Sequence, residues 1–588
     1  MSLYNNELYK LSTGEPVTSS TDFCSPADEY RAAFADREHL FLNYYTFRDG
    51  GIQERTLTRG KFWDLACSAV AYLNDHGLSK GDRIVHGFSS NTLDDMVFRL
   101  AAVLAGCVPV TVNWQADDNE LIIYKTKLTD AKLIVYDSDF TSRLAEIKPD
   151  LPAIRFVEAN NVEGYQAANR LTYPELSYDD EKIIIFTSGT TGKPKGVSLS
   201  HRSYLANMLT FEQYFGMSAN TQLDLLLVNP LHHTNSSALA DWGMRRSGTI
   251  IHLMQRYSTA FWKILVKVAS TRRELLVTSL VSRHFDFLES LSIESKLPIE
   301  EALIKEALSQ TDILIGSAPV GPTTVKRIIK FSNHLPHVRF GSTESCLEVM
   351  ATPTALSQNE LMQAFEAGWT HCYRDEETIG YYIGREHFPF TRVKLVKAID
   401  PENSEYFHPC EIGEPGYLIT QGPNMMSCYV NNAEGTEDVF RQGWYTGLRD
   451  IGFTLRNEKD GQLDYYWMSR DSALLLRGGA NYAYDQIAVE LSKVLVEDFQ
   501  LNPEHFKLAI VGLRLESEHE DSCYVTIELS KEIKDIEPRL KDCFIKTASG
   551  KVSKGARPDY VRFAPIPLNF KGAVVYPTLK QDCLDSLK

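Results

Sequence analysis

The chain has 588 residues, 43% hydrophobic and 23% charged, which is ordinary for a globular protein with several cores and excludes a disordered or fibrous chain. The formal net charge of −16 argues against a nucleic-acid partner, because phosphate backbones are held by clustered Lys and Arg. The ten Cys are scattered without CxxC spacing, so they indicate reduced thiols rather than a zinc site or a disulfide framework.

Membrane and targeting segments are not expected. The longest nearly apolar stretch, residues 100–112, includes Gly106 and Pro109 and is shorter than the ~18 residues of a membrane-spanning helix. It is typical of a helix followed by a buried strand. The first residues lack the apolar core of a signal peptide, and the last, LDSLK, are not a peroxisomal address. We therefore expect a cytoplasmic protein without a transmembrane segment.

Helical and strand patterns alternate from about residue 56 to residue 349, which predicts an α/β fold. The expected architecture is a large N-terminal domain of helices layered on mainly parallel sheets. In the first unit, a helix over residues 61–76 leads into a strand over residues 83–88. Further elements are expected over residues 131–136 and 183–186 and from about Arg202.

The strand over residues 183–186 leads into TSGTTGKPKG, residues 187–196, a loop in which nothing can build a core. Its backbone N–H groups, hydroxyls and ammonium groups together are the chemistry that holds a polyphosphate. The loop is not a Walker A motif, because only two residues lie between Gly189 and Gly192 where that motif needs four. A polar hairpin turn is the alternative, although turns rarely need two Lys and four hydroxyls.

This string resembles the phosphate loop of the adenylate-forming superfamily, which includes acyl-CoA synthetases, peptide-synthetase adenylation domains and firefly luciferase. The likeness runs from GLSKGDRIV at residues 77–85 to IKTASGKVSK at residues 545–554. It implies that ATP lies against the loop, in a cleft between a large N-terminal domain and a small mobile α+β C-terminal domain. The loop residues implied in binding are Thr187, Ser188, Gly189, Thr190, Thr191, Gly192 and Lys195.

A second motif, FGSTE at residues 340–344, lies downstream of GSAPVGP, which ends an expected strand over residues 313–315. Gly permits close backbone approach, Thr offers a hydroxyl, and Glu offers the hard oxygen that suits Mg²⁺. Alone, this string could be any loop. The resemblance implies that Thr343 contacts the α-phosphate, Glu344 ligates magnesium and Phe340 lies against adenine. The implied nucleotide contacts comprise Gly316, Ser317, Ala318, Phe340, Gly341, Ser342 and Thr343.

Short strand-like runs broken by Gly and Pro predict a small β-rich subdomain over about residues 405–469. Its WYTGLRDIGF string departs from the family's usual WYRTGDIGF, because Leu448 and Arg449 separate Asp450 from the preceding Thr-Gly pair. The local turn must therefore differ. The resemblance still implies that Asp450 accepts hydrogen bonds from the ribose hydroxyls, a task that suits a carboxylate. A surface turn is the alternative.

A compact set of elements predicts an α+β C-terminal domain over residues 470–588, after an N-terminal domain over residues 1–469. The resemblance places the hinge near Ser472, where relatives carry Asp or Lys, and a hinge residue need only absorb a backbone rotation. The expected elements cover residues 473–476, 485–495, 508–511, 524–529 and 531–541.

The same segment carries two residues with implied contacts. Arg470 matches the family's Arg that reaches ribose and phosphate, a role for a rigid guanidinium. Gly479 matches the Gly beside the pantetheine tunnel of CoA ligases. A plain turn at Gly478-Gly479 is the alternative.

KTASGKVSK, residues 546–554, is expected to be a Gly-Ser loop with three Lys. Lys551 matches the family's catalytic lysine, which bridges the attacking carboxylate and the α-phosphate. Positive charge at the junction of two anions stabilises the transition state more than the separated reactants. A solvated lysine loop is the alternative.

NPLHHTNSS, residues 229–237, resembles the segment that lines the acyl site. His233 matches the family's gating His, and no third ligand at a usual spacing supports a metal at this His pair. Amino-acid-activating relatives place an Asp where this chain has Thr234. Acetate-activating relatives place a Trp where it has Gly341, which favours a larger acyl or aryl acid.

Together these motifs predict an ATP-dependent, AMP-forming acid–thiol ligase that uses Mg²⁺ and CoA and acts on a medium- or long-chain fatty or aryl acid. An enzyme that adenylates a fatty or amino acid and loads a carrier protein is the main alternative. A luciferase-like oxygenase and an inactive scaffold on the same fold are weaker ones.

Overall fold

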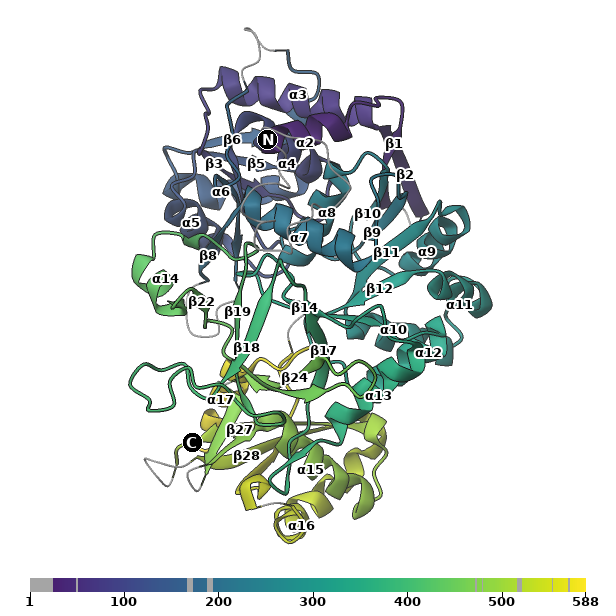
Figure 1. Cartoon of the computed structure of the whole chain (residues 1–588), viewed down its shortest axis with the longest axis vertical. Coiled ribbons are helices and arrows are strands. Elements are labelled where there is room, and N and C mark those ends of the chain that lie inside the picture. The colour runs from purple at the N-terminus through teal and green to yellow at the C-terminus, as the bar shows by residue number, and fades with distance from the viewer. Residues whose placement is uncertain are drawn as a thin grey trace.

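The computed structural model describes residues 25–48, 51–166, 173–187, 194–470, 473–477, 480–515, 521–552, 554–568 and 572–588. Figure 1 shows two parts. The large lobe comprises the described residues up to Arg470, and the small lobe comprises those from Ala473 onward. The predicted α/β class is confirmed, whereas the domain boundary stays a prediction because Ser472, its expected hinge, lies outside the described residues.

The first sheet of the large lobe has the strand order β20-β8-β7-β4-β3-β5-β6. Strands β3 to β7 pair in parallel, and β8 and β20 add antiparallel at one edge. The central strands are continuous apolar runs, the pattern of parallel strands covered by helices on both faces. The strands are β3 (Arg83–Gly87), β4 (Val108–Thr111), β5 (Leu133–Tyr136), β6 (Arg155–Glu158), β7 (Glu181–Phe186), β8 (Gly196–Ser200) and β20 (Cys428–Tyr429).

Helices of this layer begin at side-chain caps. The Thr58 and Thr92 hydroxyls accept backbone N–H groups at the starts of α3 and α4, and α4 ends at Gly106 in the left-handed region (φ 72°). The predicted helix and strand of the first unit are confirmed to within two residues, and residues 100–112 form the end of α4 followed by β4. The helices are α2 (Pro26–Ala33), α3 (Arg59–Asp75), α4 (Leu93–Ala105), α5 (Asn119–Leu128), α6 (Leu144–Ile147) and α7 (His201–Tyr214).

The second sheet begins with the order β2-β1-β10-β9-β11-β12-β13 and is parallel from β1 to β13. The strands are β1 (Leu40–Arg48), β2 (Gly51–Thr58), β9 (Leu223–Leu227), β10 (Thr249–Met254), β11 (Leu275–Leu280), β12 (Asp312–Ile315) and β13 (His337–Phe340). The connecting helices are α8 (Thr234–Arg245), α9 (Ala260–Thr271), α10 (Ser282–Ile293), α11 (Glu301–Ser309) and α12 (Pro322–Ser332). As a result, the loops after these parallel strands gather at one sheet edge.

The predicted β-rich segment, about residues 405–469, lies within a longer, mainly antiparallel part of the large lobe that is continuous with both sheets. Antiparallel strands extend the second sheet through β14, β17, β24, β23, β19, β22 and β21, whereas β20 joins the first sheet. This part comprises β14 (Met350–Ala351), α13 (Gln358–Trp369), β15 (Cys372–Tyr373), β16 (Glu376–Glu377), β17 (Tyr381–Glu386), β18 (Arg392–Val396), β19 (Gly416–Gln421), α14 (Ala433–Val439), β21 (Phe440–Arg441), β22 (Trp444–Tyr445), β23 (Asp450–Arg456) and β24 (Leu463–Arg470).

The small lobe has a hydrophobic core of its own, drawn from residues between Ala473 and Cys583. It holds a β25-β26 hairpin and the sheet β27-β28-β29. The elements are β25 (Leu474–Arg477), β26 (Ala480–Ala483), α15 (Tyr484–Glu497), β27 (Phe506–Leu513), β28 (Ser522–Leu529), α16 (Glu537–Ser549), β29 (Tyr560–Phe563) and α17 (Tyr576–Asp585).

One small-lobe prediction is wrong. Residues 531–536 form a 3₁₀ turn, and the helix begins only at Glu537, where a Pro occupies its first turn. The helix then runs to Ser549, so the first residues of the expected Gly-Ser loop are helical and Gly550 ends the helix. Lys551 therefore follows a helix end directly.

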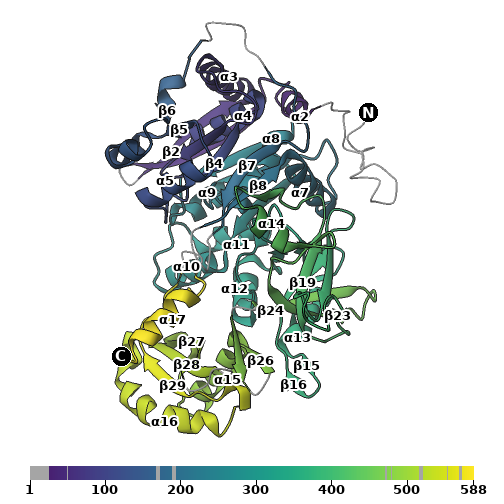
Figure 2. The ribbon, with the colours of Figure 1, turned by 90° about the vertical axis from the view of Figure 1, so that its left-hand side faces the viewer.

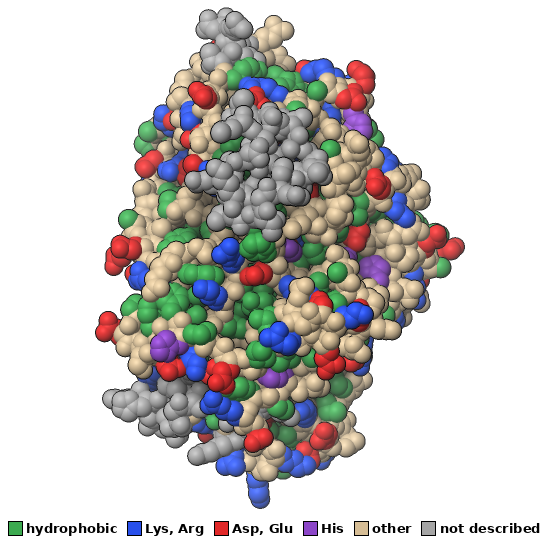
Figure 3. Space-filling model, viewed as in Figure 1, with side chains coloured by type: hydrophobic (Ala, Val, Ile, Leu, Met, Phe, Trp, Pro, Cys, Tyr) green, Lys and Arg blue, Asp and Glu red, His purple; other side chains and the backbone are tan. Residues whose placement is uncertain are grey.

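In the described part of the chain, no helix has the length and apolar character needed to cross a membrane. On the face in Figure 3, acidic and basic side chains are interspersed.

Candidate active site

Two predicted nucleotide loops leave neighbouring parallel strands at the same edge. Strands β12 and β13 pair with Ile315 opposite Val338, so Gly316 follows one strand beside the end of the other. A Cβ on Gly316 would lie 2.9 Å from the carbonyl oxygen of Arg339, which leaves no room for a side chain. Ser317 has φ 73°, a left-handed conformation that non-glycine residues seldom adopt and that is often found at functional sites.

The FGSTE loop is a tight turn after β13. The Leu347 N–H donates to the Ser342 carbonyl at 3.1 Å, and the Cys346 N–H donates to the Thr343 carbonyl at 3.1 Å. A Cβ on Gly341 would lie 1.8 Å from the Leu347 carbonyl oxygen. The turn itself therefore requires this glycine, so its presence does not by itself favour a larger acid.

The Glu344 carboxylate is held by a residue that the sequence did not single out. The Tyr429 hydroxyl donates to Glu344 Oε1 at 2.9 Å and lies 3.3 Å from the Tyr445 hydroxyl, which also hydrogen-bonds to Glu344. Burial, and then the nearby Glu344 charge, raises the pKa of both tyrosines, so they remain phenols that can donate. No spacing signal marks Tyr429, because strand pairing alone brings β20 beside β8.

The two described ends of the predicted phosphate loop lie near the same tyrosine. The Thr187 N–H donates to the Lys195 carbonyl at 3.1 Å where β7 and β8 diverge, and Lys195 Nζ lies 4.6 Å from the centre of the Tyr429 ring. The predicted loop contacts Ser188, Gly189, Thr190, Thr191 and Gly192 lie outside the described residues. The end of the loop and Glu344 thus meet on Tyr429.

Asp450 and Arg470 face each other across the antiparallel strands β23 and β24. The Asp450 carboxylate, only 4% exposed, accepts Trp467 Nε1–H at 2.8 Å and Arg470 Nε–H at 3.2 Å, while the Arg470 side chain is 57% exposed. Of the two extra residues before Asp450, Leu448 is buried and Arg449 is left-handed (φ 52°), and a turn that differs from that of relatives stays a prediction. A surface turn at Asp450 is ruled out by its burial.

The predicted acyl-site segment lies after β9. His233 precedes the first turn of α8, and its ring centre lies 4.3 Å from that of His232, which in turn packs 5.6 Å from Trp114. Two buried side chains hydrogen-bond to this segment: Arg99 on α4 and Asn91 in the loop before α4. Asn91 accepts the Leu231 N–H at 2.8 Å, and Arg99 donates to the Leu231 carbonyl at 2.8 Å.

Lys551 is not brought to this assembly. It forms an ion pair with Asp498, and its side chain is 53% exposed. Helix α16, which ends just before it, lies at the lower tip of Figure 1, with α15 between it and the large lobe. Gly479 lies outside the described residues. In this orientation the candidate site therefore contains the large-lobe residues without the predicted catalytic lysine.

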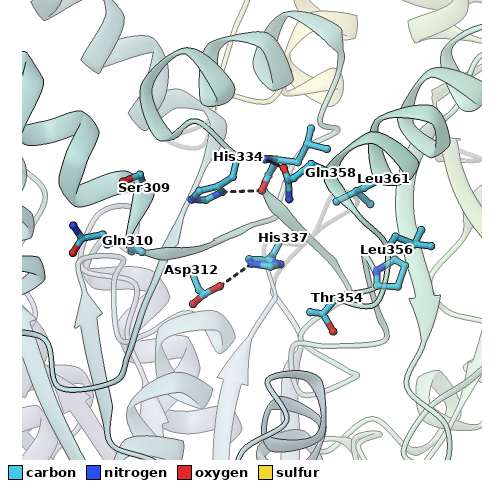
Figure 4. A pocket seen from close by; sticks show the side chains of 12 residues that line it. Ser309, Gln310, Asp312, His334, His337, Thr354, Leu356, Gln358 and Leu361 are labelled. Carbon is cyan, nitrogen blue, oxygen red and sulfur yellow. Dashed lines mark hydrogen bonds and ion pairs between the residues drawn. The ribbon is translucent and has the colours of Figure 1, made fainter.

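A hollow of about 340 Å³ lies elsewhere, at the amino ends of β12 and β13. Figure 4 shows His337 and Asp312 directed toward each other within it, with His337 Nε2 2.9 Å from Asp312 Oδ1. None of the predicted site residues lines it. Because the predicted nucleotide loops leave the opposite ends of these strands, this hollow is separate from the candidate active site.

The residues around Glu344 fit a magnesium ion that travels with a nucleotide. Mg²⁺ is usually held by one or two carboxylates together with substrate phosphates rather than by an all-protein cage. Among the described residues there is no group of three or more His, Cys, Asp or Glu that could hold a metal. A single carboxylate, Glu344, beside the end of a predicted phosphate loop fits a Mg²⁺ site that is completed by the phosphates of the nucleotide.

A family model described as AMP-binding enzyme matches residues 31–430. A 2-succinylbenzoate–CoA ligase of Bacillus cereus is 24% identical over 447 residues, covering 74% of this chain and 78% of the relative. The peroxisomal trans-cinnamate:CoA ligase of Petunia hybrida is 23% identical over 483 residues, covering 76% of each. The structure is also similar to that of the Bacillus subtilis o-succinylbenzoate coenzyme A synthetase in complex with ATP and magnesium ion. The TM-score is 0.68 at 18% identity, with 95% of this chain and 99% of that chain covered.

Because the family model covers more than half of its 588 residues, the chain belongs to the AMP-binding enzymes, the adenylate-forming group that its motifs indicate. The prediction of an ATP-dependent, AMP-forming acid–thiol ligase is confirmed at this level. The expected ATP and Mg²⁺ agree with the ligands of the Bacillus subtilis complex.

Proposed function

We propose that the chain joins a carboxylic acid, specifically an aryl acid, to CoA in two half-reactions. An acid oxygen attacks the α-phosphorus of ATP, the bond from that phosphorus to the bridging oxygen breaks, and acyl-AMP and pyrophosphate form. The CoA sulfur then attacks the acyl carbon and displaces AMP, while the thiol proton is lost to solvent. The observation that carries this proposal is the meeting of Lys195 and Glu344 on Tyr429, beside the Asp450–Arg470 pair.

Each large-lobe residue has a role that its position supports. Glu344 would hold Mg²⁺, which offsets charge on the phosphates, and Lys195 would contact the departing pyrophosphate. Asp450 would accept the ribose hydroxyls, and the half-exposed Arg470 would reach ribose and phosphate. Thr343 would contact the α-phosphate from the tight turn after β13. Positioning and fixed charge then supply most of the rate enhancement.

Lys551 is proposed to act only in the first half-reaction. In the present orientation it pairs with Asp498, and β26 packs beside β24 instead. A rotation of the small lobe near Ser472 would bring Lys551 to the junction of the acid carboxylate and the α-phosphate. The orientation described here would then belong to the second half-reaction.

The acid class rests on the relatives and on the acyl-site segment. The two relatives act on 2-succinylbenzoate and trans-cinnamate, both aryl acids. Trp114 and His232 offer flat surfaces beside His233, whereas Thr234 provides no carboxylate for a substrate ammonium. We therefore propose an aryl acid ahead of a medium- or long-chain fatty acid, and an amino acid last. Cytoplasmic localisation stays a prediction.

Pyrophosphate exchange over a panel of aryl, fatty and amino acids tests the first half-reaction. We expect acid-dependent exchange with one or more aryl acids, and adding CoA should convert the trapped acyl-AMP to thioester and AMP. If the acyl-AMP reacts with a phosphopantetheinylated carrier protein but not with CoA, the acceptor is the carrier protein and not CoA. Absence of exchange with every acid, together with absence of ATP binding, would refute the proposal.

A further inference from the structure

The predicted acyl-site segment, residues 229–237, is supported by a buried guanidinium that no sequence motif marks. Arg99 lies in α4 and is 6% exposed. Figure 2 shows α4, α8 and α7 next to one another in the upper part of the large lobe, and Arg99 hydrogen-bonds from α4 to α8. Burying a charge is costly unless the charge is paired and hydrogen-bonded, so the contacts of Arg99 indicate its role.

Arg99 contacts the segment on both sides of its histidine pair. Arg99 Nη2 donates to the Leu231 carbonyl at 2.8 Å, one residue before His232. Arg99 Nη1 donates to Ser237 Oγ at 2.9 Å, four residues after His233. Between these two points the chain enters α8, whose first turn is closed by a hydrogen bond from the Ser237 N–H to the His233 carbonyl at 3.0 Å. The two arms of one planar guanidinium therefore span the start of α8 and fix its position relative to α4.

The remaining nitrogen of the guanidinium ties Arg99 to its own helix. Arg99 Nε donates to Asp95 Oδ1 at 2.8 Å, one turn earlier on α4, and His86 Nδ1 on β3 lies 2.9 Å from the same oxygen. Burial alone would raise the pKa of the Asp95 carboxyl, but the Arg99 charge and the His86 hydrogen bond outweigh burial and lower that pKa. Asp95 is therefore a carboxylate that offsets the charge of Arg99 and holds the direction of its guanidinium.

The other contacts of the segment agree with a rigid support. Ser237 Oγ also lies 2.7 Å from the Tyr204 hydroxyl on α7. Asn91, which is buried in the loop before α4, donates to the Asn229 carbonyl at 3.1 Å. The segment is thus held by side chains from α4, from α7 and from the loop before α4, and Arg99 contributes the charged donors.

We propose that Arg99 is a positioning residue for acid recognition, which holds the start of α8 so that His233 and Thr234 keep a fixed place beside the acid. This inference rests on the proposed function, which places the acid at this segment. The predicted nucleotide loops follow other elements, β7, β12 and β13, so losing the contacts of Arg99 should weaken acid binding and spare nucleotide binding. A fixed segment also sharpens the preference for one acid, because a surface that can repack accepts several shapes.

The test compares two full-length variants, Arg99→Lys and the matched control Arg246→Lys. Arg246 follows the other end of α8, is also 6% exposed, pairs with Glu212 and donates to two backbone carbonyls. In Arg99→Lys the charge that offsets Asp95 remains, but one ammonium replaces a fork of donors. The acid KM in pyrophosphate exchange should rise by about 10-fold or more, whereas the ATP KM and the rate at saturating acid should change by less than about twofold. Arg246→Lys should leave the acid KM and the ATP KM at their wild-type values.

Ser237→Ala is a second variant that keeps the test decisive if Arg99→Lys does not fold. It removes the acceptor of Arg99 Nη1 and leaves the Asp95 ion pair and the Leu231 contact intact. The acid KM should therefore rise in the same direction by a smaller factor, about 2- to 5-fold. An acid KM equal to that of the wild type in Ser237→Ala and in any folded Arg99 variant would contradict the proposal.

A second readout does not depend on activity. Hydrogen–deuterium exchange of the backbone amides of residues 229–240 should be faster in Arg99→Lys and unchanged in Arg246→Lys. Faster deuterium uptake throughout the large lobe, with equal rises in the acid KM and the ATP KM, would show a merely structural role and overturn the inference. If the wild type gives no pyrophosphate exchange with any acid while the local change in deuterium uptake persists, the proposed function fails and the positioning of the segment by Arg99 stands.

Discussion

The two halves of the proposed site are built in opposite ways. Glu344 and Asp450 are each held by a strand residue, Tyr429 of β20 and Trp467 of β24, which donates to one oxygen of the carboxylate. Lys551 stands after a helix end on another lobe, half exposed and paired with Asp498. Under the proposed function, groups that contact the nucleotide in both half-reactions can be rigid, whereas a cation needed in only one of them must be able to leave the site. The contrast suits a division in which the fixed residues bind the nucleotide and Lys551 acts in the first chemical step.

The sharpest test of this contrast is Lys551→Ala. Removing a charge aimed at the transition state should lower acyl-AMP formation by about 10²- to 10³-fold, and thioester formation from supplied acyl-AMP should change little. Rapid-quench assays of each half-reaction measure both rates. Lys546→Ala, on the last turn of α16, is the matched control and should resemble the wild type. An equal fall in both half-reactions would show that Lys551 does not act in acyl-AMP formation alone.

Glu344→Gln tests the rigid half. The amide keeps an acceptor for Tyr429 but loses the charge that holds Mg²⁺, so turnover should drop by about 10- to 100-fold and need more magnesium. Magnesium titrations at saturating ATP give the comparison. Tyr429→Phe should have a smaller effect in the same direction, because the carboxylate remains and only its orientation is lost. A magnesium requirement equal to that of the wild type would remove Glu344 from the metal site.

Asp485→Asn tests, through pH, a buried carboxyl group of the small lobe. Burial raises the pKa of Asp485 from 3.8 to about 6. The folded state therefore binds this proton more tightly than the unfolded state. That stabilisation is complete below pH about 3.8 and is lost as the pH rises through about 6.

At pH 7 and above the Asn variant should therefore be the more stable protein, by at most about 2 to 3 kcal/mol, with the difference vanishing near pH 4. Thermal unfolding at several pH values checks this. Tyr381 and Tyr576, which interact with Asp485, stay neutral over this range because burial raises the pKa of each. A difference that grows as the pH falls would mean that Asp485 is stabilised as a carboxylate.

The smallest effect is expected from Asp498→Asn. A half-exposed ion pair contributes at most about 1 kcal/mol, so freeing Lys551 should raise acyl-AMP formation by no more than about fivefold. The thioester step should be unchanged. Glu497→Gln, one residue earlier, serves as the control. A slower first half-reaction would show that Asp498 assists Lys551 rather than holding it away.

Several elements were open to prediction because local patterns decide them. The helix at residues 61–76 and the buried strand of residues 183–186 follow from apolar periodicity and capping residues, and both are present. The failure at residues 531–541 has a local cause as well, since the Pro after Glu537 favours a helix start there rather than six residues earlier. Sequence patterns do not rank two possible starts when both lie in charged, exposed segments.

The sequence by itself determined the family of this protein, because the motifs that mark it each need particular side chains at a short spacing, and it supplied the candidate residues: the predicted polyphosphate loop, the FGSTE carboxylate, Asp450 and Lys551. Only the tertiary structure decided which of these groups meet. Tyr429 reaches Glu344 because β20 pairs with β8, Tyr576 reaches Asp485 because the start of α17 packs beside the start of α15, and Lys551 forms an ion pair with Asp498. Such contacts join residues far apart in the chain, and their geometry depends on strand pairing and lobe docking, which no local spacing records.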